Sequence, residues 1–144
     1  HEGEWLRLAV CQGFSGAEKL IGLKFPDNDE LFQQVTKTGQ PIILEDAQKD
    51  ARFKKWGNAD RARGWMAIPL VHRGQVMGCI TLDHSKPSAY NEDIIETAMA
   101  FANQAAAALE NARLFQEQSR RSRIIEVLAD IANEIATTRD VAQK

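Results

Sequence analysis

The sequence is poor in the residue types that mark several common protein classes. Of its 144 residues, only two are cysteine, three are histidine and one is tyrosine. It contains no run of 18 apolar residues, so we expect no membrane-spanning helix and no membrane contact by this chain. Eighteen basic and 20 acidic side chains leave a formal net charge of −2. Because so small a charge attracts neither nucleic acid nor anionic lipid, we expect no nucleic-acid partner.

The short motifs of metal binding and catalysis are also missing. No Cys-x-x-Cys or His-x-x-x-His spacing predicts a metal site, and no Gly-x-Ser-x-Gly, P-loop or Gly-x-Gly-x-x-Gly motif occurs. Cys11 and Cys79 lie in apolar, strand-like stretches, which favours buried free thiols in a reducing, cytoplasmic compartment over a disulfide or a metal pair. The acidic pairs Asp29-Glu30 and Glu92-Asp93 stand where helices are expected to begin, which favours capping. We therefore predict that the chain is not an enzyme.

The residues that are present predict a packed α+β domain. Hydrophobic residues make up 44% of the chain, which is enough for a core. Residues 65–84, WMAIPLVHRGQVMGCITLDH, alternate with a period of two around Arg73-Gly74, which indicates a β-hairpin covered on both faces. Earlier strands are expected at Trp5–Cys11 and Ile42–Leu44. A short helix is expected between a cap at residues 27–29 and Gly39.

The C-terminal third predicts one long helix. From Asn91 to the end there is neither glycine nor proline, and Asn91 can cap the helix, which we expect to run to about Thr138. A first apolar stripe is expected to bury against the domain's own sheet; it comprises Ile94, Ala98, Phe101, Ala105, Ala108, Ala112 and Phe115. A second stripe, Ile124, Leu128, Ile131 and Ile135, faces another direction. It favours a partner helix, with cover for an open part of the same domain as the alternative.

Several segments together resemble a GAF domain over roughly residues 4–118. They are Ala67–Leu70, Arg73–Gly78 and Ile80–Leu82 in the hairpin, Gly39–Ile42 with Glu45-Asp46 before it, and Phe101–Ala106 with Leu109–Phe115 in the long helix. The resemblance implies an α+β fold in which an antiparallel sheet carries a long C-terminal helix on one face. We expect a sensor domain over residues 1–118 and a linker helix, or the start of a following domain, over residues 119–144. Family members usually begin with a helix and a strand before the Trp5–Cys11 strand, so the N-terminal helix and first strand are expected to be missing here.

The resemblance also implies a function. GAF domains act as sensor or dimerisation modules in histidine kinases of two-component systems, cyclic-dinucleotide enzymes, phosphodiesterases and transcription regulators. We therefore expect a regulatory small-molecule sensor and dimerisation module of a bacterial-type signal-transduction protein, which passes a conformational signal through its C-terminal helix. The alternative is a ligand-free structural dimerisation domain. The expected partners are a second copy, bound through a coiled coil of the C-terminal helix, and an adjacent output domain.

The resemblance points to one candidate ligand site. In relatives, the segment corresponding to residues 46–64 roofs a small-molecule pocket. Three large aromatics and two arginines lie on or beside it, namely Phe53, Trp56, Arg61, Arg63 and Trp65. They favour a charged or aromatic small ligand; the alternative is that the aromatics are core and the arginines are solvated. We identify no cofactor.

Three ligands or activities of relatives are not expected here. The segment of residues 46–64 has no cysteine to which a bilin could be attached covalently. The Asn-Lys pair of cyclic-nucleotide-binding relatives is absent from the corresponding stretch, where Asp83-His84 stands instead. Some relatives reduce free methionine sulfoxide, but both cysteines of this chain lie in predicted strands without a flexible resolving thiol.

Overall fold

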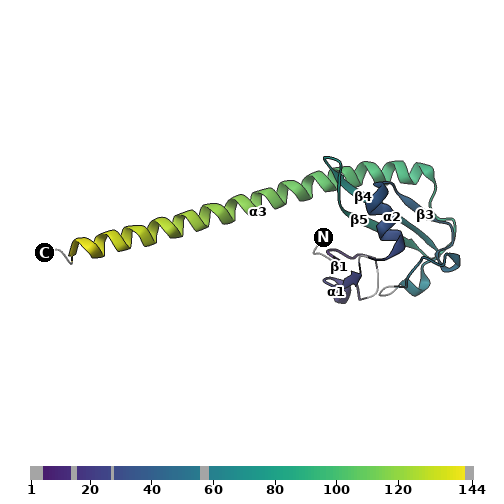
Figure 1. Ribbon diagram of the computed structural model, residues 1–144. Coiled ribbons are helices and arrows are strands. Elements are labelled where there is room, and N and C mark those ends of the chain that lie inside the picture. Colours follow the sequence, from purple (N-terminus) through teal and green to yellow (C-terminus); the bar gives the residue numbers. More distant parts are fainter. Residues whose placement is uncertain (1–4, 14–15, 27, 56–58, 142–144) are drawn as a thin grey trace. The chain divides into compact units, whose positions relative to one another are not determined.

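The computed structural model describes residues 5–13, 16–26, 28–55 and 59–141, without the side chains of Trp5, Ala59 and residues 132–141. The chain divides into two compact units, residues 1–106 and 107–144, which are described separately. Figure 1 labels the elements. The first unit is an α+β structure, as predicted, with an antiparallel sheet and the beginning of the long helix.

A three-stranded antiparallel sheet organises the first unit, in the order β3 (Ile42–Leu44), β4 (Gly64–His72) and β5 (Gln75–His84). The predicted hairpin is β4–β5. Its turn holds Arg73 at φ 51° and Gly74 at φ 78°, and two successive positive φ values match the right-handed twist of the strands. Seven successive residues of β4 are buried, which confirms the predicted cover on both faces for this strand, whereas no residue of β5 is buried.

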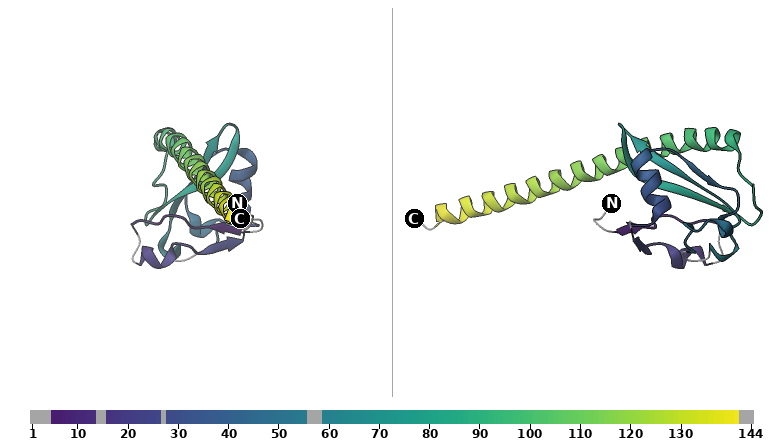
Figure 2. Two further views of the ribbon diagram at one scale, coloured as in Figure 1. Left: turned by 90° about the vertical axis from the view of Figure 1, so that its left-hand side faces the viewer. Right: turned by 45° about the vertical axis from the view of Figure 1, so that its right-hand side comes forward.

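Helix α2 (Glu30–Thr38) covers one face of the sheet (Figure 2). Its cap lies within the predicted residues 27–29: Asp29 Oδ1 accepts hydrogen bonds from the backbone N–H groups of Leu31, at 3.1 Å, and Phe32, at 3.3 Å. Gly39 ends the helix with φ 63°, as predicted. The core under α2 contains Leu31, Val35, Ile42, Leu44, Ala47, Trp65 and Ala67.

Helix α3 (Glu92–Val141) covers the opposite face with its first turns. Asn91 Oδ1 accepts a hydrogen bond from the N–H of Ile94 at 3.0 Å, which confirms the predicted cap. Ala102 and Ala106 are fully buried against the side chains of β4 that point away from α2. This second core contains Met66, Ile68, Leu70, Ala102 and Ala106, with Ile95, Met99 and others partly buried around it.

The predicted orientation of α3 was wrong by about a quarter of a turn. Phe101, which was expected in the core, is 66% exposed, and Ile94 is 39% exposed. The structure buries Ala102 and Ala106 instead, because two methyl side chains let the helix backbone approach the sheet closely. The bulkier Phe101 lies on the flank of the helix. Only Ala98 and Ala105 belong both to the predicted stripe and to the partly buried residues around the core.

The remaining elements are short. A separate antiparallel pair joins β1 (Trp5–Arg7) to β2 (Lys24–Pro26), with α1 (Ala17–Leu20) between them. The strand predicted over Trp5–Cys11 is therefore shorter than expected. Two 3-10 helices, η1 (Ala47–Lys49) and η2 (Ala59–Arg61), connect β3 to β4.

The second unit consists of the rest of α3, up to Val141. Ion pairs within the helix hold Arg113 to Glu110 and Glu117, and Arg121 to Glu117. Large apolar side chains are exposed along it, namely Leu109, Leu114, Phe115, Ile124, Ile125, Val127, Leu128 and Ile131. In the described part of the chain, no helix is both long and apolar enough to cross a bilayer.

Candidate functional site

Two of the predicted site residues, Phe53 and Trp65, are brought together under α2. Their ring centroids are 5.8 Å apart, and the rings meet edge to face at 70°. Trp65 comes from the first half of β4 and is only 5% exposed, while Phe53 follows η1 and packs against the same core. Such aromatic pairs stabilise a core beyond their buried area by about 0.5–1.5 kcal/mol. In this state the two rings fill space instead of lining an open cavity.

Arg63 is held by a carboxylate. Its Nε donates to Asp46 Oδ1 at 2.8 Å, and Nη2 donates to Oδ2, so the two groups form a bidentate pair. The hydrogen bond from Arg63 holds the pKa of Asp46 below its usual value, and the same bond raises the pKa of Arg63. Asp46 also caps η1 by accepting from the N–H of Gln48. The pair thus joins the segment after β3 to the start of β4.

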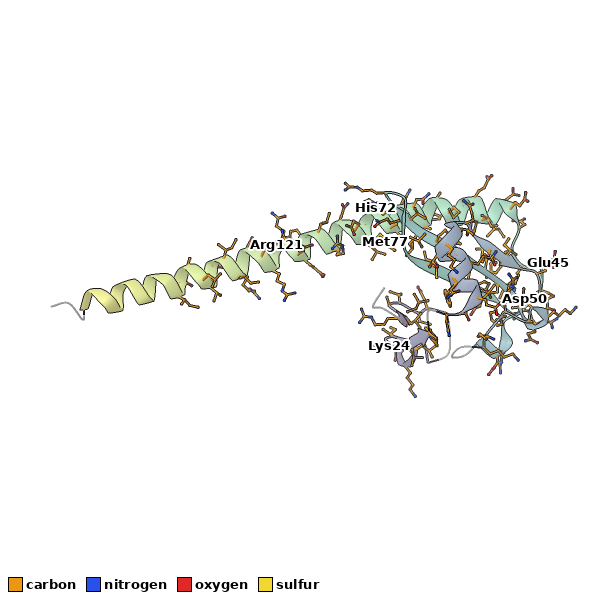
Figure 3. The ribbon with its side chains drawn as sticks, in the orientation of Figure 1. Lys24, Glu45, Asp50, His72, Met77 and Arg121 are labelled. Atoms are coloured by element: carbon orange, nitrogen blue, oxygen red, sulfur yellow. The ribbon has the colours of Figure 1, made fainter. Side chains whose placement is uncertain are left out.

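A polar hollow of about 500 Å³ opens beside this ion pair. It lies at the end of the sheet where Glu45 and Asp50 are found, away from His72 at the hairpin turn (Figure 3). The residues lining it are Glu45, Asp46, Lys49, Asp50, Arg63, Pro87 and Ser88. Asp50 is itself paired with Arg52 at 2.6 Å. A ligand in this hollow would meet two cations, Lys49 and Arg63, and three carboxylates.

Of the other two predicted site residues, Arg61 joins neither group. Arg61 ends η2 and is exposed, and Trp56 lies outside the described residues. Sequence reasoning missed Asp46, Lys49 and Asp50 as neighbours of Arg63. No motif in the sequence marks these three residues as neighbours of Arg63, and in the structure Asp46 also serves as the cap of η1.

Cys79 lacks the features of a reactive thiol. Cys79 packs against the core under α2, and burial, followed by the nearby charge of Asp29, raises its pKa to about 12. A thiol with that pKa is almost entirely protonated at neutral pH and is a poor nucleophile. Cys11 is half-buried and unpaired. Within the residues that the structure places, no three His, Cys, Asp or Glu side chains gather as metal ligands would.

An apolar hollow of about 360 Å³ lies on the other face, between the sheet and the flank of α3. Sequence reasoning missed it because the predicted orientation of α3 placed Ile94 and Phe101 in the core. Its lining residues are Met66, Leu82, Asn91, Asp93, Ile94, Thr97, Ala98 and Phe101.

Comparisons with known proteins identify the architecture. A family model described as GAF domain matches residues 2–110. No curated protein matches the chain. Among solved structures, the GAF domain of a phosphoenolpyruvate-protein phosphotransferase from Coxiella burnetii superimposes with a TM-score of 0.62 at 22% identity, covering 72% of this chain and 62% of that one. This chain therefore spans about three fifths of that relative.

Two further structures share the fold. The GAF-B domain of DevS from Mycobacterium smegmatis has a TM-score of 0.60 at 17% identity, covering 80% of this chain and 77% of that one. A free methionine-R-sulfoxide reductase from Neisseria meningitidis has a TM-score of 0.56 at 15% identity, covering 63% and 53% respectively. At these identities the likeness establishes the fold alone, and it shows that regulatory and enzymatic proteins share it.

Proposed function

This chain belongs to the GAF domain family, and from that premise we propose that it is a regulatory small-molecule sensor and dimerisation module of a bacterial-type signal-transduction protein. GAF domains are regulatory sensor modules of signalling proteins. In the proposed mechanism, α3 pairs with its copy and passes a change in packing to an adjacent output domain. We place the protein in the cytoplasm.

The exposed apolar side chains of α3 carry the proposal. Between Ile124 and Ile131, the described helix leaves five large apolar side chains at least 48% exposed: Ile124, Ile125, Val127, Leu128 and Ile131. Soluble monomers rarely expose such a contiguous apolar stripe, because its contact with water is unfavourable. Ile124, Leu128 and Ile131 are spaced by four and three residues, the repeat that lets two helices bury one seam against each other.

The packing of α3 on the sheet supports signal transmission. Ala102 and Ala106 are buried without space around them, so a shift of the sheet requires a shift or rotation of the helix. A ligand shifts the equilibrium between two packings of α3 on the sheet only if it binds one of them more tightly than the other. We propose that the segment between β3 and β4 binds the ligand differently in the two packings. The hydrogen bond between Asp46 and Arg63 connects this segment to the start of β4.

For the ligand, we propose a small zwitterionic molecule in the polar hollow, whose cationic group would meet the carboxylates and whose anionic group would meet Lys49 and Arg63. A thermal-shift screen of nucleotides, amino acids and organic acids tests this. The expected result is a class of compound that raises Tm in the wild type and in Lys54→Gln, but not in Arg63→Gln. A uniform absence of shifts would contradict ligand sensing.

The alternative function is a ligand-free structural dimerisation domain, and the filled core under α2 favours it. The Phe53–Trp65 pair occupies the side of the sheet on which a ligand was predicted. This alternative predicts dimerisation without any thermal shift. We also propose that the chain is not an enzyme, which the packing of Cys79 against the core under α2 supports for that thiol.

Dimerisation through α3 is tested by sedimentation equilibrium. Leu128→Asp places a charge on the apolar stripe and is expected to raise the dissociation constant at least tenfold. Ser122→Asp adds the same charge to the opposite side of the helix, at about 160° from Ile124, and is expected to leave the constant unchanged. Equal effects of the two substitutions would contradict the proposal.

A further inference from the structure

Two charged residues continue the apolar stripe of α3 toward the start of the helix. The four-and-three spacing of Ile124, Leu128 and Ile131, extended backward, reaches Arg121, Glu117 and then Leu114. These residues therefore follow one line on the helix surface. We call this line the extended stripe; it comprises Leu114, Glu117, Arg121, Ile124, Leu128 and Ile131.

The two charged residues already pair within one helix. Arg121 Nη2 donates to Glu117 Oε1 at 2.7 Å, and Arg113 Nη1 donates to Glu117 Oε2 at 3.5 Å. The side chain of Arg121 is 74% exposed, and this contact uses one of the five N–H donors of its guanidinium. Arg121 therefore has donors in reserve with which to bind a second carboxylate.

A parallel, in-register pair of α3 helices suits both halves of the extended stripe. Each position then lies beside its own copy, so Ile124, Leu128 and Ile131 bury against the same residues of the second helix. Glu117 and Arg121 form neighbouring layers about 6 Å apart along the axis. Arg121 of each helix can then bind Glu117 of the other, and the two positive and two negative charges sum to zero.

Antiparallel pairing suits only one half at a time. A register that places Ile124 opposite Leu128 separates Arg121 from Glu117 of the second copy by about 21 Å along the axis, at 1.5 Å per residue. A register that places Glu117 opposite Arg121 instead puts Leu128 opposite Glu110, a charged residue one step further along the same line. Apolar contact and charge complementarity are therefore met together in the parallel arrangement.

We propose that two copies of α3 pair in parallel and in register, and that Glu117 and Arg121 select this arrangement. The inference rests on the dimerisation proposed above and adds the orientation and register of the second copy. Charged layers in a helix pair lower its stability, but they discriminate against other registers because a shifted charge meets an apolar layer.

Disulfide trapping of the full chain in a Cys11→Ser background tests the orientation. Leu114→Cys is expected to cross-link to its own copy under mild oxidation, because in-register parallel helices place the two thiols side by side. In the antiparallel registers above, the two copies of residue 114 lie at least about 15 Å apart along the axis. Phe115→Cys, which is equally accessible but lies about 100° around the helix, is expected to cross-link at least tenfold more slowly.

Charge variants test the role of the polar layers by sedimentation equilibrium. Arg121→Glu and Glu117→Arg each give both layers one sign, so each is expected to raise the dissociation constant of the dimer at least tenfold. An equal mixture of the two variants is expected to form a heterodimer, because its layers are complementary. Arg123→Glu makes the same change of charge about 160° from Arg121 and is expected to leave the dissociation constant unchanged.

The outcomes separate this inference from the proposed dimerisation. A wild-type dimer in which Leu114→Cys cross-links no faster than Phe115→Cys would overturn the parallel register and leave the dimer intact. A mixture of Arg121→Glu and Glu117→Arg that associates no better than either variant alone would remove the role of the charges. A wild-type chain that stays monomeric at every concentration would overturn both proposals. Circular dichroism checks that each variant keeps its helix.

Discussion

At Gly64 the backbone leaves no space for a side chain. A Cβ at this position would lie 2.7 Å from the backbone oxygen of Lys86 and 2.9 Å from Cβ of Ala89. We predict that Gly64→Ala lowers the free energy of unfolding by about 1–3 kcal/mol, because the loop after β5 must move. Urea denaturation of the wild type and the variant measures this loss of unfolding free energy. Gly78→Ala is the matched control, since its nearest contact is an ordinary 3.8 Å to Leu70, and equal losses in the two variants would contradict the explanation.

Asp83 makes stability depend on pH. Burial in β5 raises the pKa of its carboxyl group above the ordinary 3.8. Between the ordinary and the raised pKa, the folded protein binds more protons than the unfolded chain, so this group reduces stability as the pH rises through that interval. We predict that Asp83→Asn gains stability relative to the wild type between acidic and neutral pH. Urea denaturation at several pH values checks this, and parallel pH profiles for the two proteins would refute it.

At the scale of elements, the caps differ in burial. Asp29 is 5% exposed and accepts two backbone hydrogen bonds at the start of α2, whereas the exposed Asn91 accepts one at the start of α3. We predict that Asp29→Ala costs about 1–2 kcal/mol of unfolding free energy, and that Asn91→Ala costs less. Chemical denaturation of both variants measures the two losses of unfolding free energy. A larger loss for Asn91→Ala than for Asp29→Ala would contradict the prediction.

Elements set by local chemistry could be predicted from the sequence. The β4–β5 hairpin, the Asp29 cap and the Gly39 stop depend on residues that are close in the chain. The orientation of α3 could not be predicted in the same way. The heptad pattern predicted Phe101 in the buried seam. In the structure Ala102 and Ala106 face the sheet instead, because their small side chains allow the helix to pack closely.

The candidate site was predicted only in part, for a similar reason. The Phe53–Trp65 contact follows from two aromatics that flank one loop. The pair of Arg63 with Asp46 joins residues 17 positions apart, and no local pattern marks it. The apolar hollow was missed because it exists only once Ile94 and Phe101 lie on the flank of α3.

At the scale of the whole molecule, we propose that α3 joins two copies along the stripe that includes Leu128. The apolar side chains that the described helix leaves exposed, together with their four-and-three spacing, support this pairing. A regulatory domain that signals through such a helix needs the two copies paired in a fixed register. Only then does a rotation of α3 produce one particular movement in the adjacent output domain.

Site-specific disulfide formation tests this claim most directly. In a Cys11→Ser background, in which Cys79 stays partly buried against the core under α2, Leu128→Cys is expected to cross-link two copies rapidly under mild oxidation, because seam positions face each other in paired helices. Ser122→Cys, on the opposite side of the helix, is expected to cross-link at least tenfold more slowly. Equal rates at the two positions, or no cross-link at Leu128→Cys, would contradict the account.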